Sequence, residues 1–292
     1  MSLSFFTQLI ISGLTVGSVY ALVAVGFTLI YSASDVFNFA QGEFVMLGGV
    51  LTAAAISSGT PYWAAAIVGI AGAVVVGFLL NLLVIRPAKD ASPIILLILT
   101  IGASVFIRGI TSVIFGKDFV KLPALFDVDS WQIAGATVQV QGVAIIVAAT
   151  AVVTVLWVFL TSTQLGKAVR ATSSNRLASI LVGISPSAIV GLSFAVSALI
   201  GAVGGILLTP LTLMSYDSGT LLAIKGFAGA MLGGMGHPAG PLVGALLVGL
   251  IEAFGAGYIS SAYKDVFTFL VLLLVLGIRP HGLLGGDRVE RV

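Results

Sequence analysis

The stretch FFTQLIISGLTVGSVYALVAVGFTLI, residues 5–30, decides the class of this protein. It has no charged residue, and it exceeds the roughly 20 apolar residues that a helix needs to cross a hydrocarbon core about 30 Å thick. No basic segment precedes it, and it continues far beyond the apolar region of a signal peptide. We therefore interpret it as a retained transmembrane span.

Similar apolar stretches recur along the whole chain. Hydrophobic residues make up 59% of the sequence and charged residues only 8%, which excludes an ordinary soluble domain. The predicted spans are 8–30, 40–57, 62–85, 93–115, 142–160, 188–208, 220–236, 239–258 and 264–279. The sequence therefore predicts an all-α, polytopic transmembrane helix bundle of eight or nine spans, as one domain over residues 1–292, with the short 220–236 segment either a span or re-entrant.

Basic residues are concentrated in alternate connections. The 86–92 turn, the 161–187 connection and the C-terminal tail carry eight of them: Arg86, Lys89, Lys167, Arg170, Arg176, Arg279, Arg288 and Arg291. Positive residues favour the cytoplasmic side of a membrane, so these connections are expected to face inward. The 116–141 loop, with Asp118, Asp127 and Asp129, is expected to face outward.

Two connections are too long to be simple turns. In the outward one, the alternation over residues 137–141 predicts a short strand on the membrane surface. The inward one, 163–187, has the pattern of an amphipathic helix that ends at Gly183 and is followed by Pro186 at the start of the next span. Such a helix either lies among lipid headgroups or receives a partner.

Glycines inside the spans favour close helix packing, and two glycine clusters suggest more. Met-Leu-Gly-Gly occurs at 46–49 and again at 231–234, in spans expected to run in opposite directions, which suggests inverted-repeat halves. Paired glycine-interrupted segments indicate a transport path, although packing alone is the alternative. The candidate pathway residues are Asn38, Phe39, Gln41, Gly42, Glu43, Met46, Gly48, Gly226, Gly229, Gly233 and Gly234.

Four ionisable side chains fall inside predicted spans, namely those of Glu43, Arg108, Lys225 and Glu252. A charged group in hydrocarbon costs roughly 2.5 to 3.5 kcal/mol on insertion scales, so each is a functional candidate or needs a partner. Arg108 and Glu252 are expected at a similar depth. We therefore predict that these two form an ion pair.

Several kinds of chemistry lack the residues they require. Neither Gly116-Lys117-Asp118 nor Gly166-Lys167-Ala168 completes a phosphate-binding loop, so any ATP is expected to be hydrolysed by another subunit. The chain has no cysteine and only two histidines, His237 and His281. We therefore expect no catalytic site, metal or other cofactor, and the net charge of +2 gives no indication of nucleic-acid binding.

Several motifs, in order, resemble one known family. They are Gly17-Ser18-Val19-Tyr20-Ala21-Leu22, Asn38-Phe39-Ala40-Gln41-Gly42-Glu43, Arg170-Ala171-Thr172, Leu232-Gly233-Gly234-Met235-Gly236 and Arg279-Pro280-His281-Gly282-Leu283-Leu284-Gly285. Over nearly the whole chain, the sequence resembles the branched-chain amino acid permeases of bacterial ABC importers, the Liv type.

The resemblance implies a permease subunit in the bacterial plasma membrane. It implies a second permease, related or identical, two cytoplasmic ABC ATPase subunits and an extracytoplasmic substrate-binding protein as partners. It assigns ATPase coupling to the 161–187 segment, with Lys167, Arg170, Arg176, Leu177 and Gly183. The expected solute is a branched-chain or other small amino acid, and related systems carry urea, amides or aromatic acids.

The chain departs from the family at two points. Gln41 occupies a position where the family commonly has histidine, and no acidic residue lies near Ser174-Asn175. The first departure bears on the solute and the second on ATPase docking. The alternative functions are an ion-coupled secondary transporter, for which few intramembrane acids are available, and a membrane scaffold without transport.

Overall fold

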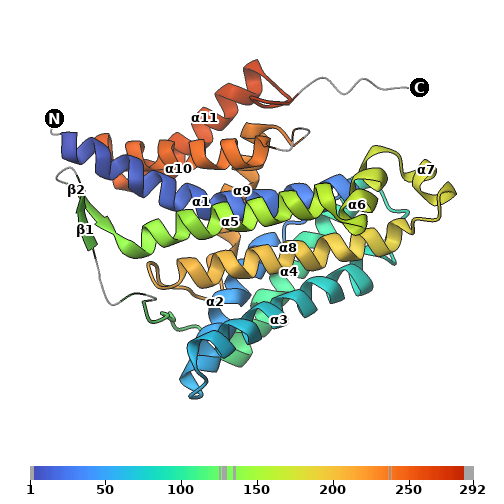
Figure 1. Cartoon of the computed structure of the whole chain (residues 1–292), viewed down its shortest axis with the longest axis horizontal. Helices are drawn as coiled ribbons and strands as arrows, with labels where there is room; N and C mark the ends of the chain where they lie inside the picture. Colours follow the sequence, from blue (N-terminus) through green and yellow to red (C-terminus); the bar gives the residue numbers. More distant parts are fainter. Residues whose placement is uncertain are drawn as a thin grey trace. The chain divides into compact units, whose positions relative to one another are not determined.

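Helices form nearly all of the secondary structure that the structure describes. The structure is a computed structural model, and it describes residues 3–124, 126, 130–133, 136–235, 237 and 239–285 (Figure 1). The elements, in order, are α1 (Leu3–Ser34), α2 (Gln41–Ser57), α3 (Tyr62–Leu80), η1 (Asn81–Ile85), α4 (Pro93–Phe115), β1 (Ser130–Ile133), β2 (Ala136–Gln139), α5 (Val140–Ser162), α6 (Gln164–Ser174), α7 (Arg176–Leu181), α8 (Pro186–Leu208), α9 (Ser218–Gly233), α10 (Gly240–Tyr258), η2 (Ser261–Tyr263) and α11 (Lys264–Ile278).

Each of the nine predicted spans corresponds to a helix, which confirms a multi-pass helical membrane protein. Seven helices in the described part of the chain are long and apolar enough to cross a membrane. The exceptions are α2 and α9, with 17 and 16 residues. At 1.5 Å per residue they reach only about 24–26 Å. Both copies of Met-Leu-Gly-Gly therefore lie on, or at the end of, a helix too short to span.

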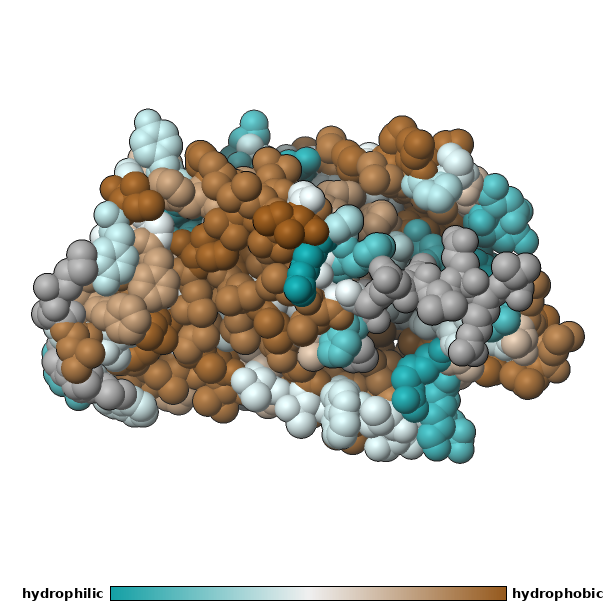
Figure 2. Space-filling model, turned by 90° about the horizontal axis from the view of Figure 1, so that it is seen from above, coloured by the Kyte–Doolittle hydropathy of each residue, from teal (hydrophilic) through white to brown (hydrophobic). Residues whose placement is uncertain are grey.

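Apolar side chains remain exposed on the long helices, as expected where lipid is the solvent. On α4 they include Ile94, Phe106 and Val113, the last with 85% of its surface exposed. Figure 2 shows hydrophobic residues over much of the face in view, with hydrophilic residues gathered in fewer places.

The chain forms two compact units, each built from segments that are distant in sequence. One unit comprises Met1–Val25, Ala124–Thr150 and Lys225–Val292, and the other comprises Gly26–Pro123 and Ala151–Ile224. The unit boundaries fall within α1, α5 and α9, so these three helices contribute to both units. A single domain over residues 1–292 stays a prediction.

In the second of these units, α2, α3 and α8 pack against one another (Figure 1). A Cβ atom on Gly205 of α8 would collide with the carbonyl oxygen of Val45 on α2. Gly48 of α2 lies equally close to the backbone of Ala202, and Gly69 of α3 lies against Gly48. Because these positions lack side chains, the three backbones approach closely and every residue from Gln41 to Val50 is buried.

In the first unit, glycines bring together α1, α9 and α10. Gly13 and Gly17 of α1 lie against the backbone of α10, and Gly249 of α10 lies against Gly17. Gly244 of α10 lies against Gly229 of α9. The small-residue spacings therefore mark helix contacts, as the sequence indicated.

The two sets of three helices are built from matching parts of the chain. We take α1–α4 as one half of the chain and α8–α11 as the other. The first set joins α2 and α3 with α8, which is the first helix of the other half. The second set joins α9 and α10 with α1, which is again the first helix of the other half. This exchange supports two related halves. Their inverted orientation stays a prediction.

The predicted surface strand is present, although it is displaced by one residue and shorter. β2 pairs antiparallel with β1, with Trp131 opposite Val138, and Val140 already begins α5. The pairing strand β1 was not predicted. Asp127 and Asp129, which helped to define this loop as outward-facing, lie outside the described residues.

The 163–187 segment contains two helices, whereas the sequence predicted one. Asn175 has an extended backbone between α6 and α7, and its side-chain oxygen accepts a hydrogen bond from the Ala178 N–H at 2.9 Å. This is an N-cap interaction, and it starts a new helix where the predicted one would have continued. Gly183, at φ +84°, ends the segment, and Pro186 begins α8, as predicted.

We expect Gly205→Ala to destabilise the protein, because the added methyl group meets the Val45 carbonyl in a tightly packed contact. Overpacking of this kind costs about 1–3 kcal/mol. Thermal unfolding of the purified protein in detergent measures the effect. Gly102→Ala on α4 is the matched control, because nothing lies within 4 Å of its added methyl group. Equal melting temperatures for the two variants would refute the packing assignment.

Candidate functional site

A cluster of buried polar side chains surrounds the beginning of α2. Asn38, Gln41 and Glu43 have no exposed surface, although they lie among apolar helices. The Asn38 side-chain oxygen accepts from the Ala40 N–H at 3.2 Å, and its backbone carbonyl accepts from the Gln41 N–H at 3.1 Å. These bonds form the turn that ends the preceding loop and starts the helix. We call these three residues and their partners the α2 cluster.

Gln41 is held by a two-way interaction with α8. The Ser197 hydroxyl donates to Gln41 Oε1 at 2.6 Å, and Gln41 Nε2 donates to the Ser197 carbonyl at 3.3 Å. A Cβ atom on Gly26 of α1 would collide with the Gln41 amide, so the space for this amide depends on a glycine. The amide thus joins α2 to α8 within the bundle.

Glu43 is partnered by residues of α4. Ser104 donates to Oε1 at 2.8 Å, and Arg108 Nε lies 3.5 Å from the same oxygen. The second carboxylate oxygen, Oε2, is buried without a hydrogen-bond partner among the described residues, and so is Asn38 Nδ2. Buried polar atoms are usually satisfied, so two such atoms near one helix start require an explanation.

The beginnings of α2 and α9 meet in this cluster. Gly42 lies against the carbonyl of Gly219, and a Cβ atom on Gly219 would come within 2.6 Å of Glu43 Oε2. Thr220 Oγ1, in the first turn of α9, is likewise buried without a hydrogen-bond partner in the described part of the chain. Free N–H groups at helix starts attract anionic groups, and broken helices that meet in this way form solute sites in transporters.

A second group of charges lies in the other unit, and we call it the Lys225 network. Lys225 Nζ is 2.7 Å from Glu252 Oε1 and 2.6 Å from Asp265 Oδ1, while its side chain is only 2% exposed. Lys264 Nζ lies 3.1 Å from Glu252 Oε1, and the Tyr20 hydroxyl donates to Glu252 Oε2 at 2.9 Å. The network joins α1, α9, α10 and α11.

The structure gives Arg108 and Glu252 different partners from the predicted ones. Their similar predicted depth in the membrane suggested that Arg108 and Glu252 pair with each other. In the structure, Arg108 faces Glu43 and Glu252 faces Lys225. The correction has a simple reason: depth in the membrane does not tell which helices are neighbours. Asp265 and Tyr20 were missed, because Asp265 follows Lys264 directly and seemed neutralised by it.

The other pathway candidates lie at helix contacts. Phe39 packs edge-on against Phe27 with ring centroids 6.0 Å apart, and Met46 is fully buried. Gly48 lies against Ala202, and Gly226 lies against Val23. Gly229, Gly233 and Gly234 each lie against backbone atoms of their own unit, and Gly234 has φ +96°. Packing explains these glycines, and their pathway role stays a prediction.

The predicted coupling residues lie on α6, on α7 and just after it. Lys167, Arg170 and Arg176 are exposed, and Gly183 lies beyond the end of α7. Leu177 and Leu181, both on α7, have 76% and 88% of their surfaces exposed. In contrast, Val169 and Thr172 of α6 are buried. The uncovered apolar side chains of this segment thus gather on α7, although Leu165 at the start of α6 is also 54% exposed.

Fold and site together define a class: a multi-pass helical membrane protein with one cluster of buried polar groups where two short helices begin and a second group of buried charges between helices. A family model described as "Branched-chain amino acid transport system / permease component" matches residues 9–276. The chain belongs to this family.

Individual relatives agree with the family model. The chain is 32% identical over 303 residues to the high-affinity branched-chain amino acid transport system permease protein LivH of Escherichia coli K12, covering 99% of this chain and 98% of that protein. It is 33% identical over 305 residues to BraD of Pseudomonas aeruginosa, with 98% of each chain covered. It is also 26% identical to the ribose import permease protein RbsC of Haemophilus influenzae, with 89% and 81% covered. No solved structure matches this chain.

We expect Lys225→Met to destabilise the protein strongly, because it leaves Glu252 and Asp265 without their shared buried cation. Removing one partner of a buried ion pair costs about 3–5 kcal/mol. The comparison variant is Lys264→Met, which should cost no more than about 1 kcal/mol because its side chain is 43% exposed. Thermal unfolding in detergent separates the two, and similar losses for both would show that Lys225 is not the centre of the network.

Proposed function

We propose that this chain is the permease subunit of an ABC importer and forms the path by which a small amino acid, branched-chain in the first instance, crosses the bacterial plasma membrane. The observation that carries this proposal is the similarity to branched-chain amino acid permeases over nearly the full length of the chain. The relative named as a ribose import permease supports the transport class, although its solute differs.

The partners follow from the same proposal. An extracytoplasmic binding protein delivers the solute, a second permease completes the path, and two cytoplasmic ATPases supply the energy. The uncovered apolar side chains of α7 support a docking role, because Leu177 and Leu181 would otherwise be exposed to water or headgroups. A short helix seated in a groove of another subunit can pass on its movement.

The α2 cluster is the part of the path that we propose meets the solute. Its support is the meeting of two helix starts around a buried carboxylate with one unpaired oxygen. An amino acid carries both an ammonium group, which suits Glu43, and a carboxylate, which suits helix N-termini.

The path can be tested by cysteine accessibility, for which the absence of native cysteine gives a clean background. We expect cysteines at Asn38, Gly42 and Met46 to react with polar thiol reagents in one state of the assembled transporter and to be protected in another. Cysteines at Ala21 and Ala73, which are also fully buried, serve as controls and should stay unreactive. Protection of all three test positions in every state would remove the α2 cluster from the path.

The transport function is tested by uptake into vesicles. Vesicles that contain this chain, its second permease, the ATPases and the binding protein should accumulate leucine only with ATP, whereas vesicles with this chain alone should accumulate nothing. Leucine uptake by this chain alone under a proton or sodium gradient would contradict the proposal and favour a secondary transporter. Accumulation of urea or ribose in place of leucine would change only the solute.

The same assembly tests the role of α7. Leu177→Asp/Leu181→Asp should reduce co-purification of the ATPases by about tenfold or more, because charges replace two apolar contacts. The control is Leu213→Asp, which introduces a charge at another exposed leucine outside the coupling segment. Full ATPase retention by the double variant would place the docking surface elsewhere.

A further inference from the structure

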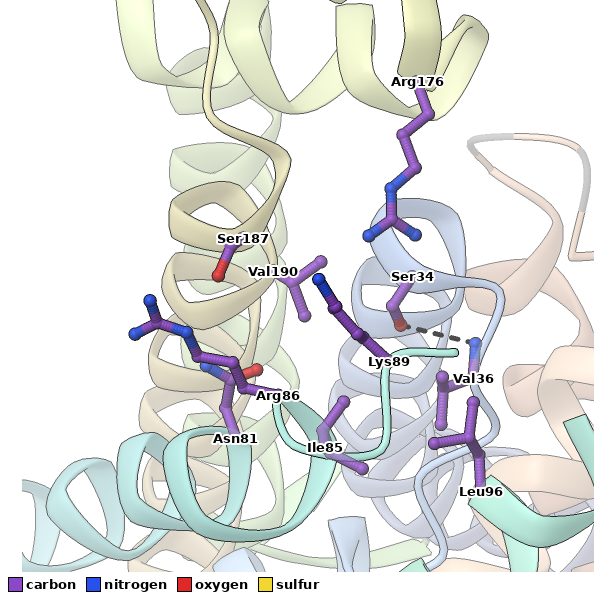
Figure 3. A pocket seen from close by; sticks show the side chains of 10 residues that line it. All are labelled: Ser34, Val36, Asn81, Ile85, Arg86, Lys89, Leu96, Arg176, Ser187 and Val190. Atoms are coloured by element: carbon purple, nitrogen blue, oxygen red, sulfur yellow. Dashed lines mark hydrogen bonds between the residues drawn. The ribbon is translucent and has the colours of Figure 1, made fainter. Parts of the chain in front are cut away.

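An open pocket with three cationic side chains lies beside the turn that follows η1. The space between its lining residues, with the open solvent at its mouth included, is about 440 Å³. Its lining comprises Ser34, Val36, Asn81, Ile85, Arg86, Lys89, Leu96, Arg176, Ser187 and Val190 (Figure 3). All of these residues belong to one unit. The pocket is lined by no residue of the α2 cluster or of the Lys225 network.

The cations come from two separate segments. Figure 3 shows the Lys89 ammonium and the Arg176 guanidinium directed into the same space, one from the turn after η1 and the other from α7, with Arg86 beside Asn81. None of the ion pairs found among the described residues involves these three side chains. The acids closest in sequence, Asp35 and Asp90, are exposed and do not line the pocket. The pocket therefore presents uncompensated positive charge.

The other wall of the pocket is apolar. Val36, Ile85, Leu96 and Val190 are buried side chains that form part of the lining. Close along the chain, Leu83 of η1 and Ile94 of α4 have 67% and 71% of their surfaces exposed. These apolar surfaces belong to helices that can span the bilayer, so they are suited to acyl chains.

The local helix geometry helps to create the pocket. Residues Asn81–Ile85 form a π-helical turn, which the Arg86 N–H closes by donating to the Asn81 carbonyl at 2.8 Å. Such wide turns in α-helices are frequent at functional sites. Gly191 of α8 leaves room for the Asn81 amide, which is 3.1 Å from the position that a Cβ atom there would take.

We infer that this pocket binds the phosphate headgroup of an anionic membrane lipid. The 86–92 turn and the 161–187 connection are both expected on the cytoplasmic side, where anionic headgroups attract basic pockets between transmembrane helices. Positive charge beside an apolar wall matches a lipid better than it matches a free anion. The bound phosphate bridges Lys89 and Arg176, and it thereby ties α7 to the turn between η1 and α4.

The test uses the purified full-length protein in detergent, with an equal mixture of phosphatidylglycerol and phosphatidylethanolamine, and counts bound lipids by native mass spectrometry. The wild type should prefer phosphatidylglycerol. Lys89→Gln/Arg176→Gln should lower its binding by on the order of tenfold, since each basic residue near an anionic surface contributes several-fold. Lys89→Arg/Arg176→Lys should retain it, which separates lost charge from misfolding.

Two further variants separate the pocket from general surface charge. Lys167→Gln/Arg170→Gln removes the same charge from the same predicted side but outside the pocket, and binding should stay within about twofold of wild type. Ser187→Phe fills the pocket without altering charge and should weaken binding as Lys89→Gln/Arg176→Gln does.

Four outcomes would overturn the inference. They are equal loss in the Lys167/Arg170 variant, unchanged binding in Ser187→Phe, no preference for phosphatidylglycerol, and inorganic phosphate binding as tightly as the lipid. The last result would identify a free-anion site. Because the readout is lipid retention, none of these outcomes depends on the transported solute.

Discussion

Close contact between helix backbones at glycine is the interaction on which the rest of this structure depends. In a bilayer, lipid tails satisfy apolar side chains as well as another helix does, so helices associate through tight packing at small residues. Gly205 against Val45 joins α8 to α2, and Gly244 against Gly229 joins α10 to α9. These contacts allow a helix too short to span the membrane to be enclosed by longer ones.

Enclosure of α2 explains how polar groups can exist at its beginning. A carboxylate in hydrocarbon is costly, but Glu43 lies inside protein, where Ser104 and Arg108 reach it. The same holds for Lys225, whose two carboxylate partners come from different helices. The two buried sets of charges each connect different helices. Glu43 joins α2 to α4, and the Lys225 network joins α9 to α10 and α11.

Sequence patterns predicted the helices well because hydrophobic length and proline or glycine boundaries are local properties. Pro186 and Gly183 marked their boundaries correctly. The partners of Arg108 and Glu252 could not be predicted, because they depend on which helices are adjacent, and sequence gives depth alone. The break at Asn175 was missed because its cause is one side-chain cap, and α6 and α7 share a continuous amphipathic pattern. The packing of α8 with α2 and α3, and of α1 with α9 and α10, likewise could not be predicted, because no local sequence pattern indicates it.

The hydrogen bonds of the α2 cluster distinguish among its candidate solute contacts. Both amide atoms of Gln41 are engaged by Ser197. A solute could contact Gln41 only after this pair separates, so a change of residue here acts first on the α2 and α8 contact. Glu43 Oε2 and Asn38 Nδ2, in contrast, have no hydrogen-bond partner among the residues that the structure describes, so within that part of the chain they need break no bond to receive a ligand. In the proposed path, the atoms most ready to meet a solute thus belong to Glu43 and Asn38, whereas Gln41 would act through the positions of the helices.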